Sequence, residues 1–172
     1  MKFKNTPIIK TDRLCLRAVD DSDREGLIEL LKNEDIGKTF MVPDFKSREQ
    51  ELKMFETFKR LSRSDERFVY GICLDDRIIG FINDVDINED TVEIGYVIHP
   101  SASGRGYATE ALNVAIGEIF ASGFTIVKAS AFEGNIASMR VMEKCGMVRT
   151  GEEESVEYRG ITRRCICYIK KV

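Results

Sequence analysis

Hydrophobic and polar positions along this chain follow two different periods, and the changes between them divide the sequence into strands and helices. Alternation with a period of two predicts strands at 12–18, 68–74, 77–84, 92–98, 125–132, 147–157 and 161–169. Helical spacing of apolar residues predicts helices that begin at the capping boxes Ser22-x-x-Glu25 and Ser47-x-x-Gln50, and two more at 108–123 and 135–144. Strands and helices are thus mixed along the whole chain.

The order of these elements predicts a mixed sheet. The strand pairs at 68–84 and 147–169 are typical of hairpins, with turns at Asp75-Asp76 and Arg159-Gly160. Strand 92–98, the helix after it and strand 125–132 form one right-handed crossover, which requires a parallel pair. We therefore expect an α/β fold with a mostly antiparallel sheet and one parallel strand pair, in a single domain that covers residues 1–172.

Composition and charge exclude several classes of partner. The 26 Lys and Arg residues stand against 29 Asp and Glu, a net charge of −3, which argues against a nucleic-acid-binding surface. No apolar run approaches the roughly 20 residues of a membrane span, and the first ten residues lack the apolar core of a secretory signal. We therefore expect a cytoplasmic protein that does not bind a membrane. The five cysteines are scattered and His99 is the only histidine, so we expect no metal site.

The clearest chemical signal is the glycine turn Ser103-Gly104-Arg105-Gly106, which follows a strand and opens into a helix. Backbone N–H groups of such a turn, together with the positive end of the helix dipole, bind anions, so the turn predicts a pocket for a phosphate-bearing cofactor. A P-loop is excluded because its spacing and lysine are missing. A dinucleotide fingerprint would use Gly104, Gly106 and Thr109 with Glu133 on the ribose, but only about 40 residues follow Glu133, too few for a doubly wound sheet.

The chain resembles the GNAT superfamily of acyl-CoA-dependent N-acetyltransferases, and within it the RimJ and RimL branch. The resemblance rests on TDRLCLR from Thr11, VEIGYVIHP from Val92, SGRGYATEAL from Ser103, NIAS from Asn135 and EKCGM from Glu143. It implies a sheet whose parallel strand pair splays apart, helices on both faces, and acetyl-CoA as co-substrate.

The resemblance also implies which residues bind the cofactor. They are Val97, Ile98, Ser103, Gly104, Arg105, Gly106, Tyr107, Ala108, Thr109, Asn135 and Ser138. Two positions depart from the family pattern. Ser103 occupies the first position of the [QR]-x-x-G-x-[GA] signature, so we expect the turn to hold pyrophosphate mainly through its backbone. Arg163-Arg164 stand where an acidic residue is common in the last hairpin, which could change the substrate or the surface.

Two residues are candidates for proton transfer. Glu93 lies in an otherwise apolar strand, on the face of Gly95 and Val97, where it could take the proton of an attacking amine. The alternatives are a glutamate that simply pairs with a lysine, a water relay, or Glu133 as base. Ser138 lies on the inward stripe of its helix, where it could protonate the departing thiolate; the alternative is a hydroxyl bonded to its own helix backbone. Tyr96 and Tyr107 could shape the acceptor and cofactor sites; the alternative is an ordinary core tyrosine.

These observations favour an acetyl-CoA-dependent N-acetyltransferase that acetylates a primary amine by direct attack in a ternary complex. The amine could be a protein N-terminus or a small molecule, and the chain could be a monomer or a homodimer. Two other functions remain open. One is a non-catalytic acyl-CoA-binding or regulatory protein that keeps the pocket without a working base, and the other is a dinucleotide-binding oxidoreductase.

Overall fold

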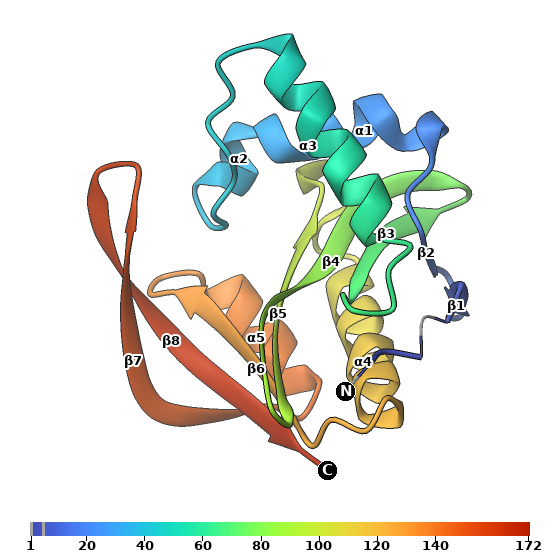
Figure 1. Ribbon diagram of the computed structural model, residues 1–172. Coiled ribbons are helices and arrows are strands. Elements are labelled where there is room, and N and C mark those ends of the chain that lie inside the picture. The colour runs from blue at the N-terminus through green and yellow to red at the C-terminus, as the bar shows by residue number, and fades with distance from the viewer. Residues whose placement is uncertain (1, 5) are drawn as a thin grey trace.

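A computed structural model describes residues 2–4 and 6–172. In chain order its elements are β1 (Ile8–Lys10), β2 (Cys15–Arg17), the 3-10 turn η1 (Asp21–Asp23), α1 (Arg24–Lys32), α2 (Glu34–Gly37), α3 (Arg48–Leu61), β3 (Val69–Leu74), β4 (Arg77–Asn88), β5 (Thr91–Ile98), the 3-10 turn η2 (Pro100–Ala102), α4 (Tyr107–Ala121), β6 (Ile126–Phe132), α5 (Ile136–Lys144), β7 (Val148–Tyr158) and β8 (Ile161–Lys171). Figure 1 shows their arrangement.

The strands form one eight-stranded sheet in the order β1-β2-β3-β4-β5-β6-β8-β7. The β5–β6 pair is parallel and its neighbours in the sheet are antiparallel. The mixed, mostly antiparallel sheet is therefore confirmed, and it follows from the crossover through α4 that the strand and helix patterns predicted. At one end of this sheet the long β7–β8 hairpin twists away from the other strands (Figure 1).

Helices cover both faces of the sheet, as expected. Leu112 and Ile116 of α4 pack with Ile94 of β5 in one apolar core. On the opposite face, Leu27 of α1 and Phe55 of α3 pack in a second core, to which Val97 of β5 contributes. Because neighbouring strand residues point to opposite faces, β5 supplies both cores from alternate positions. None of the helices in the described part of the chain has the length and apolar character needed to span a membrane.

The predicted capping box at Ser22 is wrong. Asp20 is the cap: its carboxylate accepts from the N–H of Ser22 at 2.9 Å, while the Asp23 carboxylate accepts from the N–H of Asp20 at 2.9 Å. Arg17 binds Asp23 at 2.7 Å and anchors this box to β2. The chain thus first forms the 3-10 turn η1, and α1 begins after it, at Arg24.

Other differences are smaller. Ser47 caps α3 as predicted, but the Gln50 side chain accepts from the N–H of Lys46 instead of closing the box on Ser47. The predicted first strand is shorter, and β1 before it was not predicted because only three residues pair with β2. Both hairpin turns lie where expected, with positive φ at Asp75, Asp76 and Arg159.

Candidate active site

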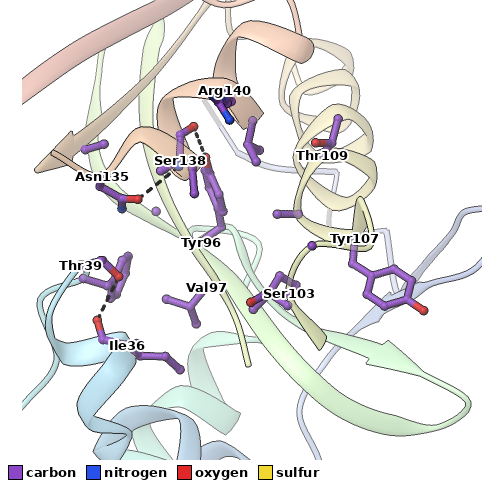
Figure 2. A pocket seen from close by; sticks show the side chains of 18 of the residues that line it. Ile36, Thr39, Tyr96, Val97, Ser103, Tyr107, Thr109, Asn135, Ser138 and Arg140 are labelled. Carbon is purple, nitrogen blue, oxygen red and sulfur yellow. Dashed lines mark hydrogen bonds between the residues drawn. The ribbon is translucent and has the colours of Figure 1, made fainter. Parts of the chain in front are cut away.

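The candidate site is a cavity of about 430 Å³ between β5 and β6. The two strands pair only through Thr91↔Ile126, Val92↔Val127 and Glu93↔Lys128, and beyond these pairs they diverge. Nearly all the predicted cofactor residues line the cavity: Val97, Ile98, Ser103, Gly104, Gly106, Tyr107, Ala108, Thr109, Asn135 and Ser138 (Figure 2). Arg105 and Glu93 do not line it.

The N-terminus of α4 opens into this cavity without a side-chain cap. Gly104 and Gly106 have φ of 75° and 83°, a left-handed conformation that glycine adopts at little cost. The carbonyl of Gly106 accepts the N–H of Glu110 at 3.0 Å. The N–H groups of the residues between Gly106 and Glu110, in the first helical turn, therefore have no partner within the helix. Free backbone donors at the positive end of a helix dipole suit a pyrophosphate.

The α5 N-terminus differs. The Asn135 Oδ1 accepts from the N–H of Ser138 at 3.2 Å, so Asn135 is an ordinary helix cap in this structure. Arg140 and Lys144 line the cavity from the same helix, and both are exposed. These two cations were not among the predicted site residues, although their spacing of four residues puts them on one helical face.

Arg13 stabilises the glycine turn, although it lies between β1 and β2, about ninety positions earlier in the chain. Its Nη1 donates to the carbonyl of Arg105 at 2.8 Å, and its Nε donates to Glu110 at 2.8 Å. Its guanidinium also lies 4.6 Å from the centre of the Tyr107 ring. Arg13 therefore binds both the glycine turn and the first turn of α4. The sequence did not indicate this role, because the partners of Arg13 are distant in sequence.

Ser103 does not aim its hydroxyl at the anion site. The Ser103 Oγ donates to the carbonyl of His99 at 3.4 Å and the side chain is exposed. This geometry fits the expectation that backbone groups of the turn dominate anion binding.

Tyr96 and Ser138 meet on the cofactor side of β5. The two hydroxyl oxygens lie 2.9 Å apart, and the Tyr96 hydroxyl donates to the Ser138 carbonyl at 3.2 Å (Figure 2). Burial raises the pKa of Tyr96 well above its usual range, so this hydroxyl keeps its proton at neutral pH. Of the two roles left open for Tyr96, shaping the site or filling the core, the structure shows both: its side chain lines the cavity and packs against the apolar core.

The backbone of β5 offers donors at the gap. The N–H of His99 donates to Ile79 in β4 at 2.7 Å. Because N–H groups alternate in direction along a strand, that of Val97 also faces β4 and that of Ile98 faces β6. Beyond Glu93 no β6 residue pairs with β5, so among the described residues Ile98 is better placed than Val97 to donate into the cavity.

Glu93 reaches the cavity through one hydroxyl. Its Oε1 accepts from the Ser130 hydroxyl at 3.0 Å, and Ser130 lines the cavity. Its Oε2 lies 3.2 Å from the Lys128 Nζ, which also binds Glu154. Within the described residues that line the cavity there is no acid at all, and Glu133 is 57% exposed and paired with Arg164. Glu93 is thus both a lysine-paired glutamate and the acid hydrogen-bonded to a cavity residue.

Cys145 packs beside the cofactor helix. Its thiol donates to the carbonyl of Thr109 at 3.4 Å, and burial raises its pKa to about 11. A protonated thiol is a weak nucleophile, so Cys145 is a packing residue, as expected for the cysteines.

The opposite side of the cavity comes from distant segments. Thr39 and Phe40, which follow α2, line it together with Gly95. A Cβ at Gly95 would lie 2.9 Å from the Phe40 ring, so glycine lets the ring reach β5. The N–H of Val42 donates to the Tyr158 hydroxyl at 3.4 Å, which joins this segment to the β7–β8 hairpin.

Known proteins share this architecture. A family model described as "Acetyltransferase (GNAT) domain" matches residues 13–148. The N-acetyltransferase YoaA of Bacillus subtilis (strain 168), whose activity is uncharacterised, is 29% identical over 161 residues, which are 91% of each chain. The microcin C7 self-immunity acetyltransferase MccE, in complex with acetyl-CoA and AMP, is 21% identical, with a TM-score of 0.82 over 94% of each chain. RimL, a ribosomal L7/L12 alpha-N-protein acetyltransferase in complex with coenzyme A, is 22% identical, with a TM-score of 0.81 over 96% of this chain and 98% of RimL. The family match covers well over half of the chain, so this protein belongs to the GNAT acetyltransferase family.

Proposed function

We propose that this chain transfers an acetyl group from acetyl-CoA to a primary amine, by direct attack within a ternary complex. The observation that carries the proposal is the uncapped N-terminus of α4, which opens into a gap between two strands that Ser130 also lines, with Glu93 hydrogen-bonded behind Ser130. Backbone donors suit a pyrophosphate at one end, and a carboxylate suits proton removal at the other. We further propose a single acetyltransferase domain that acts in the cytoplasm.

The described residues fit coenzyme A. The turn from Gly104 to Gly106 offers free backbone N–H groups, and a Cβ at Gly104 would meet nothing within 4 Å, so the turn has room beside it. Arg140 and Lys144 add positive charge for phosphate groups, while the side chains of Val97, Ile98 and Asn135 would border the pantetheine arm. Bound acetyl-CoA supplies a reactive thioester whose carbon the amine attacks.

Ile98 would stabilise the charge that develops on the thioester oxygen. An oxygen that gains negative charge in the transition state needs a preorganised donor, and removal of one such donor typically costs a factor of about 10² to 10³ in rate. The free N–H of Ile98 meets this requirement because it points away from β4. Val97 then contributes its side chain to the wall of the cavity.

Glu93 would take the proton of the amine through Ser130. The amine must lose a proton as it attacks, and Ser130 can pass that proton to the carboxylate to which its own hydroxyl already donates. Lys128 holds the other oxygen of this carboxylate at 3.2 Å and so fixes its position beside Ser130. A water relay that ends on the same carboxylate would serve equally.

Ser138 would donate to the departing thiolate. Its hydroxyl oxygen lies 2.9 Å from the Tyr96 hydroxyl, which can orient it. Cys145 offers no alternative nucleophile, since its raised pKa keeps the thiol protonated. This favours direct attack over an acetylated enzyme.

Acceptor classes follow from the relatives by analogy. RimL is described as acting on a protein N-terminus, and MccE as a self-immunity acetyltransferase. We propose a peptide N-terminus or a small-molecule amine for this chain, which works as a monomer or a homodimer.

The proposal is tested by two measurements on the wild-type protein. Calorimetry with acetyl-CoA and, separately, NAD should show binding of acetyl-CoA alone. A thiol-release assay with a panel of peptides, polyamines, amino sugars and amino acids should then show turnover with at least one class. Tight acetyl-CoA binding without turnover on any amine would favour the non-catalytic acyl-CoA binder instead, and NAD binding would favour the oxidoreductase.

A further inference from the structure

The Nε of Arg163 is the one buried side-chain nitrogen or oxygen without a hydrogen-bond partner in residues 2–4 and 6–172. Every other such atom in that part of the chain is satisfied. Leaving a buried donor unpaired costs free energy, more so when the group is charged, so native structures seldom keep one without a reason. Arg163 therefore needs an explanation that its own chain does not supply.

Its neighbour in sequence has the opposite arrangement. Arg164 binds Glu133 at 3.1 Å and also pairs with Glu153, and it is exposed. Other half-buried arginines in the described segments, such as Arg17 and Arg67, bind carboxylates at 2.7 Å and 2.6 Å. Arg163 is half-buried as well, yet no carboxylate binds it. Because residues 163 and 164 point to opposite faces of β8, the same charge has two different surroundings.

Arg163 lies on the same face of the sheet as Glu93 and Ser130. It pairs with Val156 across the β7–β8 hairpin, and its guanidinium lies 5.6 Å from the centre of the Phe132 ring. Phe132 is two residues beyond Ser130 on the same face of β6, which corresponds to about 7 Å along the strand. The guanidinium thus lies on the order of 10 Å from the hydroxyl to which we assign proton transfer.

The charged groups around it do not neutralise it. Glu154, diagonal to it on β7, is held by Lys128. Arg159 lies at the hairpin turn and pairs with Glu34 at 3.6 Å. Phe132 and Tyr158 flank the position with their rings, 5.9 Å apart, and offer no carboxylate. A planar guanidinium stacked on an aromatic ring, with its donors free, is an arrangement suited to binding a carboxylate.

We propose that Arg163 binds an anionic group of the acceptor, a carboxylate in the simplest case, on the order of 10 Å from the amine that is acetylated. This inference rests on the proposed function, since it assigns a substrate class to the same site. An acidic side chain near a peptide N-terminus and the carboxylate of a long ω-amino acid share this chemistry. Arg163 is a specificity residue in this account and takes no part in proton transfer.

The test compares acceptors that differ only in this charge. The small-molecule pair is 8-aminooctanoate and 8-aminooctanamide; the peptide pair carries Glu or Gln at the second and third positions. For wild type, kcat/KM should favour the acidic member of at least one pair by about tenfold to a hundredfold. Arg163→Gln should abolish that preference and change the neutral reaction by less than about twofold, while Arg163→Lys should restore part of it. Arg164→Gln is the matched control and should retain the wild-type preference.

Two outcomes would overturn the inference: no acidic preference in wild type, or an equal loss on both members of a pair in Arg163→Gln, which would indicate a packing role. The same four acceptors are also titrated into the CoA-bound protein by calorimetry. If no amine is acetylated, the proposed function fails, and the ratio of acidic to neutral Kd in wild type and Arg163→Gln still decides the role of Arg163. Which of the two pairs responds distinguishes a peptide from a small-molecule acceptor.

Discussion

The two sides of the cavity are built in different ways. The side to which we assign the cofactor comes from two short contiguous segments, residues 103–109 and 135–144, and offers backbone groups and the uncapped N-terminus of α4. The acceptor side is assembled from Thr39 and Phe40 after α2, Gly95 on β5 and Ser130 on β6, which are brought together by the sheet. A ligand that is common to a family can be held by the backbone, whereas a variable one needs side chains. We therefore expect that substitutions can damage the two sides separately.

The largest effect is expected for Glu93→Gln, on the acceptor side. The amide cannot accept the proton that Ser130 passes on, so kcat should fall by about 10² or more, while the Kd for acetyl-CoA stays unchanged. Steady-state kinetics and calorimetry measure the two quantities.

Glu154→Gln is the matched control for Glu93, because both carboxylates pair with Lys128. It removes one charge from the same lysine but leaves the bond between Ser130 and Glu93. An equal fall of kcat in Glu154→Gln would mean that the charge balance at Lys128 matters and that Glu93 is not the proton acceptor.

The opposite result, a loss of acetyl-CoA binding, is expected for Gly106→Pro on the cofactor side. Gly106 has φ of 83°, which proline with φ near −65° cannot adopt, so the turn must open and the Kd for acetyl-CoA should rise on the order of a hundredfold. Ser103→Ala should change this Kd by less than about threefold, since the Ser103 hydroxyl binds the backbone carbonyl of His99. A larger loss for Ser103→Ala than for Gly106→Pro would refute backbone recognition. Circular dichroism checks that both variants remain folded.

Ser138→Ala tests whether the cofactor side also takes part in the chemistry. Loss of one hydrogen bond to a charged leaving group should lower kcat about tenfold with little change in the Kd for acetyl-CoA. Tyr96→Phe keeps the ring and removes the hydroxyl that binds Ser138, so it should lower kcat less. If Tyr96→Phe were the more damaging change, the tyrosine would be the donor to the thiolate.

Local patterns predicted most of the fold and of the cofactor side. The glycine turn before α4, the cap at Asn135 and the crossover that makes β5 and β6 parallel are each encoded within a few neighbouring residues. The first capping box was misassigned because two aspartates, anchored by Arg17, compete with Ser22 for the same helix start. Competition of this kind depends on an ion pair to another strand.

What the sequence could not predict is what the sheet brings together. The pairing of Glu93 with Lys128 is set by the register of a parallel pair, and the contact of Arg163 with Phe132 by the register of β6 and β8. No periodicity reports these registers, because each joins residues more than thirty positions apart. The acceptor side therefore stayed open in the sequence, whereas the glycine turn that lines the other side of the cavity could be read from it.

Arg13 breaks this division, since it serves the cofactor side from a distant part of the chain. In Arg13→Ala the turn loses its bond to the Arg105 carbonyl and Glu110 loses its partner. We expect the Kd for acetyl-CoA to rise about fivefold, with kcat at saturating acetyl-CoA unchanged, because one net hydrogen bond that preorganises the turn is worth about 1 kcal/mol. Arg13→Lys keeps the charge but not the forked geometry, and should recover only part of the loss. An equal fall of kcat and affinity in Arg13→Ala would instead mean that Arg13 supports the whole cavity, and that the two sides cannot be separated at this residue.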